Sequence, residues 1–152
     1  MLRMQVWLWV ATVAVVFAGC KAGGGKALSQ GKYPPAMILN VTSGPGTDGH
    51  AVTMAMQLAG HALDDGRNVT LFFNVKSPPL VTRNGPAMQF GGNPPVRDMV
   101  RGLMDRGADV LVCPHCLKAA SLGAGDLIPG AQVADREKLF GRIGRNSVVF
   151  TY

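Results

Sequence analysis

From residue 36 onward, two kinds of apolar pattern alternate along the chain. Continuous apolar runs bounded by turn residues are typical of strands buried on both faces of a parallel sheet. These runs occupy residues 36–43, 68–75, 109–112, 131–134 and 146–152. Apolar residues at helical spacing lie between them and predict helices. The predicted helices span residues 50–65, 96–106, 115–122 and 136–143. This alternation predicts one three-layer α/β domain with about five mostly parallel strands.

The long segment 76–95 interrupts this alternation. It contains five prolines and three glycines, so it does not fit a helix or a strand. Loops of this length inside a compact domain commonly carry function. We expect a lid over a reactive site or a contact between subunits, and the alternative is a disordered insertion.

The N-terminus has the pattern of an export signal. Residues 6–18 form an apolar or small run of 13 residues after Arg3, which is shorter than the roughly 20 residues that a membrane-spanning helix needs. The run ends in Phe17-Ala18-Gly19-Cys20, which resembles the lipobox of bacterial lipoproteins, where the cysteine is lipidated.

This resemblance divides the chain into a signal peptide (1–19), a tether (20–35) and the α/β domain (36–152). The protein is therefore expected to lie outside the cytosol. We expect the lipid on Cys20 to anchor it to a membrane, and the α/β domain to face the periplasm or the cell exterior. The alternatives are an ordinary signal peptide cut elsewhere, or an uncleaved anchor.

Two cysteines follow the third predicted strand, in the sequence Cys113-Pro114-His115-Cys116. Pro is favoured at the first position of a helix, so Cys113 is expected to cap that helix and Cys116 to lie in its first turn. The positive end of a helix favours thiolates, which predicts a lowered thiol pKa. His115 is the nearest group able to stabilise a thiolate or accept a proton. The candidate catalytic residues are therefore Cys113, Cys116 and His115, and the alternatives are a static disulfide and a solvent-facing His115.

Other candidate site residues come from the same edge of the sheet. The carboxyl ends of parallel strands meet at one edge, where ligands and reacting groups collect. Ser43, Thr47, His50 and part of segment 76–95 are therefore expected to face Cys113.

The composition excludes several classes of protein. The 15 Lys and Arg residues exceed the 9 Asp and Glu residues, giving a net charge of +6. These cations are scattered and only 7% of residues are aromatic, whereas a nucleic-acid surface needs clustered basic residues. We therefore expect no nucleic-acid partner. The chain lacks the phosphate-binding motif GxxxxGK[ST], and we expect no cofactor.

Three stretches resemble the DsrE/DsrF-like family: Val69-Thr70-Leu71-Phe72-Phe73, residues 107–116 around the cysteine pair, and residues 126–131 with Leu127-Ile128-Pro129-Gly130. The resemblance covers roughly residues 36–152. It implies a flavodoxin-like α/β fold, assembly into homo- or hetero-oligomers, and a cysteine that carries persulfide sulfur, which matches Cys113. The sulfur-relay members are cytoplasmic and typically use one cysteine, whereas this chain has an export signal and a pair.

Three functional classes are compatible with these residues. The first is thiol chemistry, as a sulfurtransferase or thiol oxidoreductase. Cys113 is then the nucleophile or persulfide carrier and Cys116 the resolving thiol, acting on a sulfur-bearing small molecule or a partner thiol protein. The second is binding of Cu(I) or Zn through both cysteines, with His115 or His50 and a neighbouring subunit completing the site. The third is a non-catalytic oligomeric binding module with an inert disulfide.

Overall fold

The computed structural model of the protein describes residues 36–152. The predicted signal peptide, the predicted tether and Cys20 lie outside these residues. The strands are β1 (Ala36–Val41), β2 (Asn68–Phe73), β3 (Asp109–Val112), β4 (Gln132–Val133) and β5 (Val148–Thr151). The helices are α1 (Gly49–Asp64), α2 (Val96–Asp105), α3 (Pro114–Ala119) and α4 (Arg136–Phe140), with short 3-10 helices η1 (Pro78–Val81) and η2 (Ala124–Asp126).

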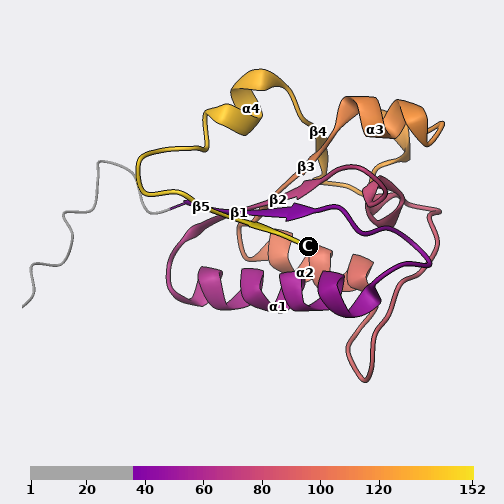
Figure 1. The fold of residues 1–152 in the computed structure, drawn as a ribbon, viewed down its shortest axis with the longest axis horizontal. Helices are drawn as coiled ribbons and strands as arrows, with labels where there is room; N and C mark the ends of the chain where they lie inside the picture. Colours follow the sequence, from indigo (N-terminus) through magenta and orange to yellow (C-terminus); the bar gives the residue numbers. More distant parts are fainter. Residues whose placement is uncertain (1–35) are drawn as a thin grey trace, which may run out of the picture.

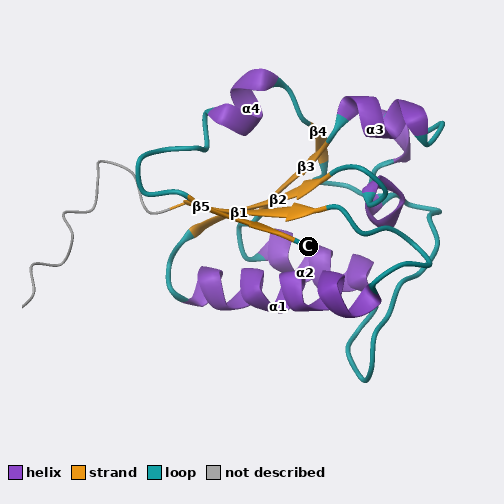
Figure 2. Cartoon of the chain, viewed as in Figure 1, coloured by secondary structure: helices purple, strands orange, loops and turns teal. Residues whose placement is uncertain are grey.

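The five strands form one sheet in the order β4-β3-β2-β1-β5, and every neighbouring pair is parallel. Helices α1 and α2 cover one face, and α3 and α4 lie on the other (Figures 1 and 2). The predicted three-layer α/β domain with about five parallel strands is therefore confirmed. Within residues 36–152, no helix combines the length and the apolar character needed to cross a membrane.

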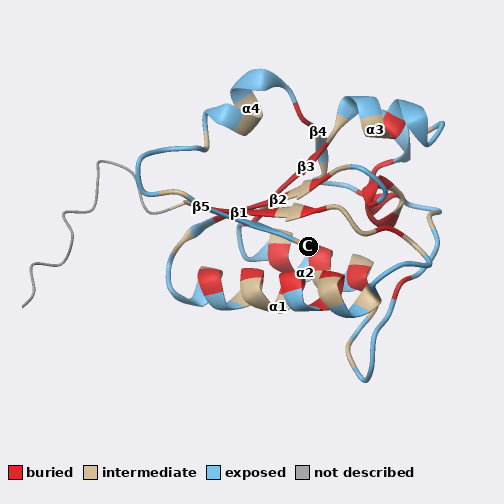
Figure 3. Cartoon of the chain, in the orientation of Figure 1, coloured by how far each residue is buried: buried red, intermediate tan, exposed pale blue. Residues whose placement is uncertain are grey.

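The two faces of the sheet are covered unequally. The main core lies between the sheet and the helices α1 and α2, whose inward faces are buried (Figure 3). On the other face, α3 buries only Leu117 and α4 buries no residue. Strand β5 is an edge strand whose four residues are all exposed, including Val149 at 56% and Phe150 at 39%. An apolar strip therefore lies open along β5.

Local interactions explain where α1 begins and ends. The carboxylate of Asp48 accepts a hydrogen bond from the Ala51 amide at 2.9 Å, which satisfies one of the free amides of the first turn. Gly66 follows the helix with a φ of +72°, a conformation that glycine adopts without strain. The predicted helix thus matches the observed one to within one residue at each end.

Other elements are shorter than predicted. Strands β1 and β2 each end two residues early, at Val41 and Phe73. In β2 the cause is Val75, whose φ of 52° is incompatible with a strand. Helix α3 ends at Ala119 rather than residue 122, shortly before Ser121, which is also left-handed with a φ of 56°.

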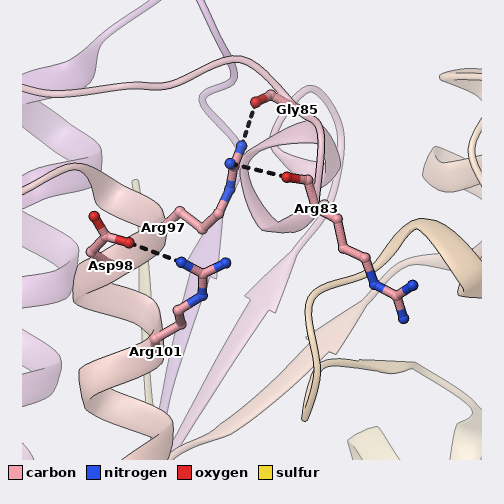
Figure 4. A network of polar contacts seen from close by, with 5 residues as sticks. All are labelled: Arg83, Gly85, Arg97, Asp98 and Arg101. Atoms are coloured by element: carbon pink, nitrogen blue, oxygen red, sulfur yellow. Dashed lines mark hydrogen bonds and ion pairs between the residues drawn. The ribbon is translucent and has the colours of Figure 1, made fainter.

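The first half of segment 76–95 is ordered and anchored. Its backbone joins the segment after η2, where the Ile128 amide donates to the Val81 carbonyl at 3.0 Å. From α2, Arg97 donates to the carbonyls of Arg83 and Gly85 (Figure 4). These contacts show that the segment is not a disordered insertion.

The second half of the segment lies beside the N-terminus of α1, on the side of the sheet away from α3 (Figure 1). There the ring of Phe90 stacks on His50 with ring centroids 4.5 Å apart, and Gln57 donates to Asn93 at 2.9 Å. This half of the segment therefore does not form the predicted lid over the cysteines, whereas η1 in the first half contacts α3. A role in contacts between subunits stays a prediction.

Candidate functional site

The cysteine pair lies where β3 passes into α3. The Cys113 amide donates to the Phe73 carbonyl at 2.9 Å, continuing the ladder between β2 and β3 by one residue. Cys113 has an extended backbone and caps α3, and Pro114 takes the first helical position, as predicted. The helix is held to the core by Leu117, which is 3% exposed. The strand ladder and this buried anchor together fix both thiols at the carboxyl edge of the sheet.

Both thiols are free and partly exposed. They also interact with each other, because the Cys113 side chain is one of the groups that raise the pKa of Cys116. The sulfur of Cys116 additionally accepts a hydrogen bond from the Val75 amide, with 3.1 Å between nitrogen and sulfur. The site thus brings two reactive sulfurs and one backbone donor together at the surface.

The Cys116 thiol is a weaker acid than the sequence predicts. Burial raises its pKa and the neighbouring Cys113 raises it further, while the hydrogen bond from Val75 opposes them. The prediction of a lowered pKa is therefore wrong for Cys116. The prediction overlooked burial, and α3 has only six residues, which limits the favourable field at its positive end.

Val75 is the residue that sequence reasoning missed. A β-branched residue at φ 52° is a backbone outlier, and such a conformation costs on the order of 1–3 kcal/mol. Nothing in the local sequence indicates it, because valine favours strands. The available signal was topological: Val75 follows a strand that neighbours β3, so its backbone lies at the edge that carries the cysteines.

Within residues 36–152, neither histidine predicted for the site forms a hydrogen bond with a cysteine, and the role of His115 stays a prediction. His115 is exposed on the first turn of α3, and within residues 36–152 its ring is in no hydrogen bond or ion pair. His50 stacks on Phe90 instead.

The polar residues that follow β1 make backbone contacts. The hydroxyl of Thr47 donates to the Gly44 carbonyl at 2.6 Å. The amide of Ser43 donates to the Tyr152 carbonyl at 3.4 Å. Neither contact involves a cysteine, so the loop after β1 contributes to the shape of this edge rather than to the thiol pair.

A metal centre is not assembled within the described part of the chain. Residues 36–152 contain no group of three or more His, Cys, Asp or Glu side chains placed to share a metal ion. Cys113 and Cys116 supply two soft ligands at most, and a tetrahedral zinc or copper site needs further ligands.

Fold and site together define a flavodoxin-like α/β protein that carries a Cys-x-x-Cys pair at the carboxyl edge of its sheet. Among solved structures, the chain is similar to the YchN protein from E. coli, with 15% identity and a TM-score of 0.59, covering 79% of this chain and 100% of that one. It is also similar to MTH1491 from Methanobacterium thermoautotrophicum, described as a protein of unknown function, with 12% identity and a TM-score of 0.59, covering 78% and 99%. No protein-family model and no curated protein sequence matches the chain.

At these identities the likeness concerns the fold alone. It confirms the flavodoxin-like α/β fold that the family resemblance implies.

Proposed function

We propose that this chain is an exported thiol protein of the DsrE/DsrF-like family, which either carries persulfide sulfur or cycles between dithiol and disulfide. The observation that carries the proposal is the pairing of two free, partly exposed cysteine thiols at the end of β3. A static structural role for such a pair is disfavoured, because a disulfide that closes so short a loop restricts the unfolded chain very little.

The two reactions share a first step, in which the Cys113 thiolate attacks a sulfur atom. With a persulfide donor, Cys113 takes the outer sulfur and the donor leaves as a thiol. With a disulfide, Cys113 forms a mixed disulfide and one thiol leaves; Cys116 then attacks the Cys113 sulfur and releases the second thiol. The second reaction oxidises two cysteines to one disulfide and reduces the substrate disulfide to two thiols.

The raised pKa of Cys116 suits the resolving role. A raised pKa lowers the fraction of Cys116 that is present as thiolate, which is the nucleophilic form. Cys113 is also the residue that the family resemblance matches to the sulfur-carrying cysteine.

Intact-mass measurement tests the proposed chemistry. After treatment with polysulfide, the Cys116→Ser variant is expected to gain the mass of one sulfur on Cys113, since no second thiol is present to remove it. The unchanged protein is expected to form the Cys113–Cys116 disulfide and to release sulfide. If the chain gains no sulfur and forms no disulfide with either polysulfide or a small disulfide, the proposed function is wrong.

Export and self-assembly form a separate part of the proposal. Support for export comes from the sequence of residues 1–20, and support for a homo-oligomer comes from the exposed apolar surface of β5. The test solubilises the full-length protein from bacterial membranes and measures its mass under native conditions. We expect an acyl group on Cys20 and an assembly of more than one subunit. An unmodified Cys20 would contradict the anchor, and a monomer would contradict the assembly.

A further inference from the structure

The turn that follows β2, residues 74–77, is in direct contact with the thiol pair. We propose that this turn is a positioning device: the Val75 amide holds the Cys116 sulfur, so that Cys116 leaves as a thiolate when an incoming thiol opens a Cys113–Cys116 disulfide. This inference rests on the proposed thiol function and deepens it, because it fixes which sulfur a substrate thiol attacks.

The conformation of Val75 has no explanation in side-chain packing. Its side chain is 61% exposed, so burial of apolar surface does not compensate for the left-handed backbone. The amide, in contrast, has a specific partner, the Cys116 sulfur at 3.1 Å. Backbone strain of this kind persists where the surrounding structure over-determines it, and it clusters at functional sites.

Hydrogen bonds to the end of β1 hold the turn in this conformation. The Asn74 amide donates to the Val41 carbonyl at 3.0 Å, and the Lys76 amide donates to the Thr42 carbonyl at 3.1 Å. The buried Ser77 hydroxyl donates to the Val41 carbonyl at 2.6 Å. The residues on both sides of Val75 are thus bonded to the neighbouring strand end, which leaves the Val75 amide free to face Cys116.

Gly44 clamps the same turn from the loop after β1. A Cβ atom at Gly44 would lie 2.0 Å from the Lys76 carbonyl oxygen, so only glycine permits this close approach of two backbones. The turn is therefore fixed both by its hydrogen bonds to the end of β1 and by its close approach to Gly44. Within residues 36–152, its contact with a cysteine sulfur comes from the Val75 backbone amide and not from a side chain.

The chemistry gives this donor a role. When a thiolate attacks the Cys113 sulfur of the disulfide, a new bond forms between the incoming sulfur and Cys113, and the bond between Cys113 and Cys116 breaks. The electron pair of that bond passes to Cys116, which becomes a thiolate. A hydrogen bond to the anionic form stabilises the leaving group. Burial raises the pKa of Cys116 and so opposes its departure as a thiolate, and the hydrogen bond from the Val75 amide counters part of that effect.

The first experiment locates the attack in the unchanged protein. The disulfide form is treated with glutathione in the presence of an alkylating reagent, which captures the cysteine that is released. Fragmentation of the peptide that contains both cysteines then shows which one carries glutathione. We expect glutathione on Cys113 and the alkyl group on Cys116, with a preference of about tenfold.

Variants at Val75 separate the donor from the side chain. Val75→Pro removes the amide hydrogen and forbids a positive φ, so the preference for Cys113 is expected to fall about tenfold. Val75→Gly keeps both the amide and the left-handed turn, and it is expected to retain the preference. Gly44→Ala, which displaces the Lys76 carbonyl, is expected to reduce it, whereas Gly92→Ala meets no atom within 4 Å and serves as its control.

The second experiment needs no substitution and therefore holds if a variant fails to fold. The amide proton resonance of Val75 is followed by NMR as the pH is raised through the ionisation of Cys116. We expect its chemical shift to titrate together with Cys116, because the donor contacts the sulfur that becomes charged.

The outcomes distinguish the inference from the proposed function. Glutathione found equally on both cysteines, or on Cys116, overturns the inference and leaves the thiol function standing, as does a Val75 resonance that ignores the ionisation of Cys116. If no disulfide forms and no thiol reacts with it, the proposed function and the inference are both wrong.

Discussion

The Cys113→Ser variant is expected to lose thiol exchange down to the background rate. The serine hydroxyl stays protonated at all relevant pH values, so the variant lacks the proposed nucleophile and keeps only Cys116, whose pKa is raised. Cys113 is partly exposed and makes its structural contacts through its backbone. Stability should therefore change by no more than about 0.5 kcal/mol. The measurement is the rate at which the purified protein reduces a small disulfide, alongside its thermal unfolding.

The matched variant is Cys116→Ser, which keeps the nucleophile and removes the resolving thiol. It is expected to form a mixed disulfide in a single step and then to stop, so that its activity is lost after one turnover. Full activity of Cys113→Ser would assign the attack to Cys116 and reverse the proposed roles.

Phe73→Ala is expected to reduce the free energy of unfolding by about 3–5 kcal/mol. Phe73 is completely buried at the end of β2, among the largest side chains of the core. Truncation leaves a cavity against α1 and α2, and domains of this kind are stable by only about 5–15 kcal/mol. Urea unfolding followed by circular dichroism measures the change.

Phe140 provides the control, since it is the same residue type at 62% exposure on α4. Phe140→Ala should change the free energy of unfolding by no more than about 0.5 kcal/mol. Equal losses in the two variants would contradict the location of the core between the sheet and α1 and α2.

The fold was largely predictable because local and tertiary signals agree. Residues 109–112 form the predicted strand without any shift in bounds, since Gly107 and Pro114 stop it on either side and its last three residues, Val110 to Val112, are apolar and buried. The same agreement fixes α1, where Asp48 and Gly66 mark the ends. The position of the cysteines followed directly, because a parallel strand delivers the next residue to the carboxyl edge.

The details of the site were less predictable, because they depend on contacts between distant segments. The left-handed Val75 is imposed by Thr42 and Gly44, more than thirty positions earlier. Likewise, segment 76–95 is predicted to be a lid over the thiols or a subunit contact, yet its second half lies at α1, where Phe90 stacks on His50. The pKa of Cys116 depends on burial by neighbouring segments, which no sequence spacing reveals.

The pairing of β5 with β1 affects the order in which the segments of the domain fold. Asn40 and Thr151, which are bonded across these two strands, are 111 positions apart, so β1 keeps one open side until almost the whole domain has been synthesised. The same segment reaches the turn at Val75. The carbonyl of Tyr152, which follows β5, accepts hydrogen bonds from the Thr42 amide at 2.6 Å and the Thr42 hydroxyl at 2.7 Å, and Thr42 in turn accepts from the Lys76 amide of the turn. The surroundings of the two sulfurs are therefore complete only once β5 and Tyr152 have joined the sheet.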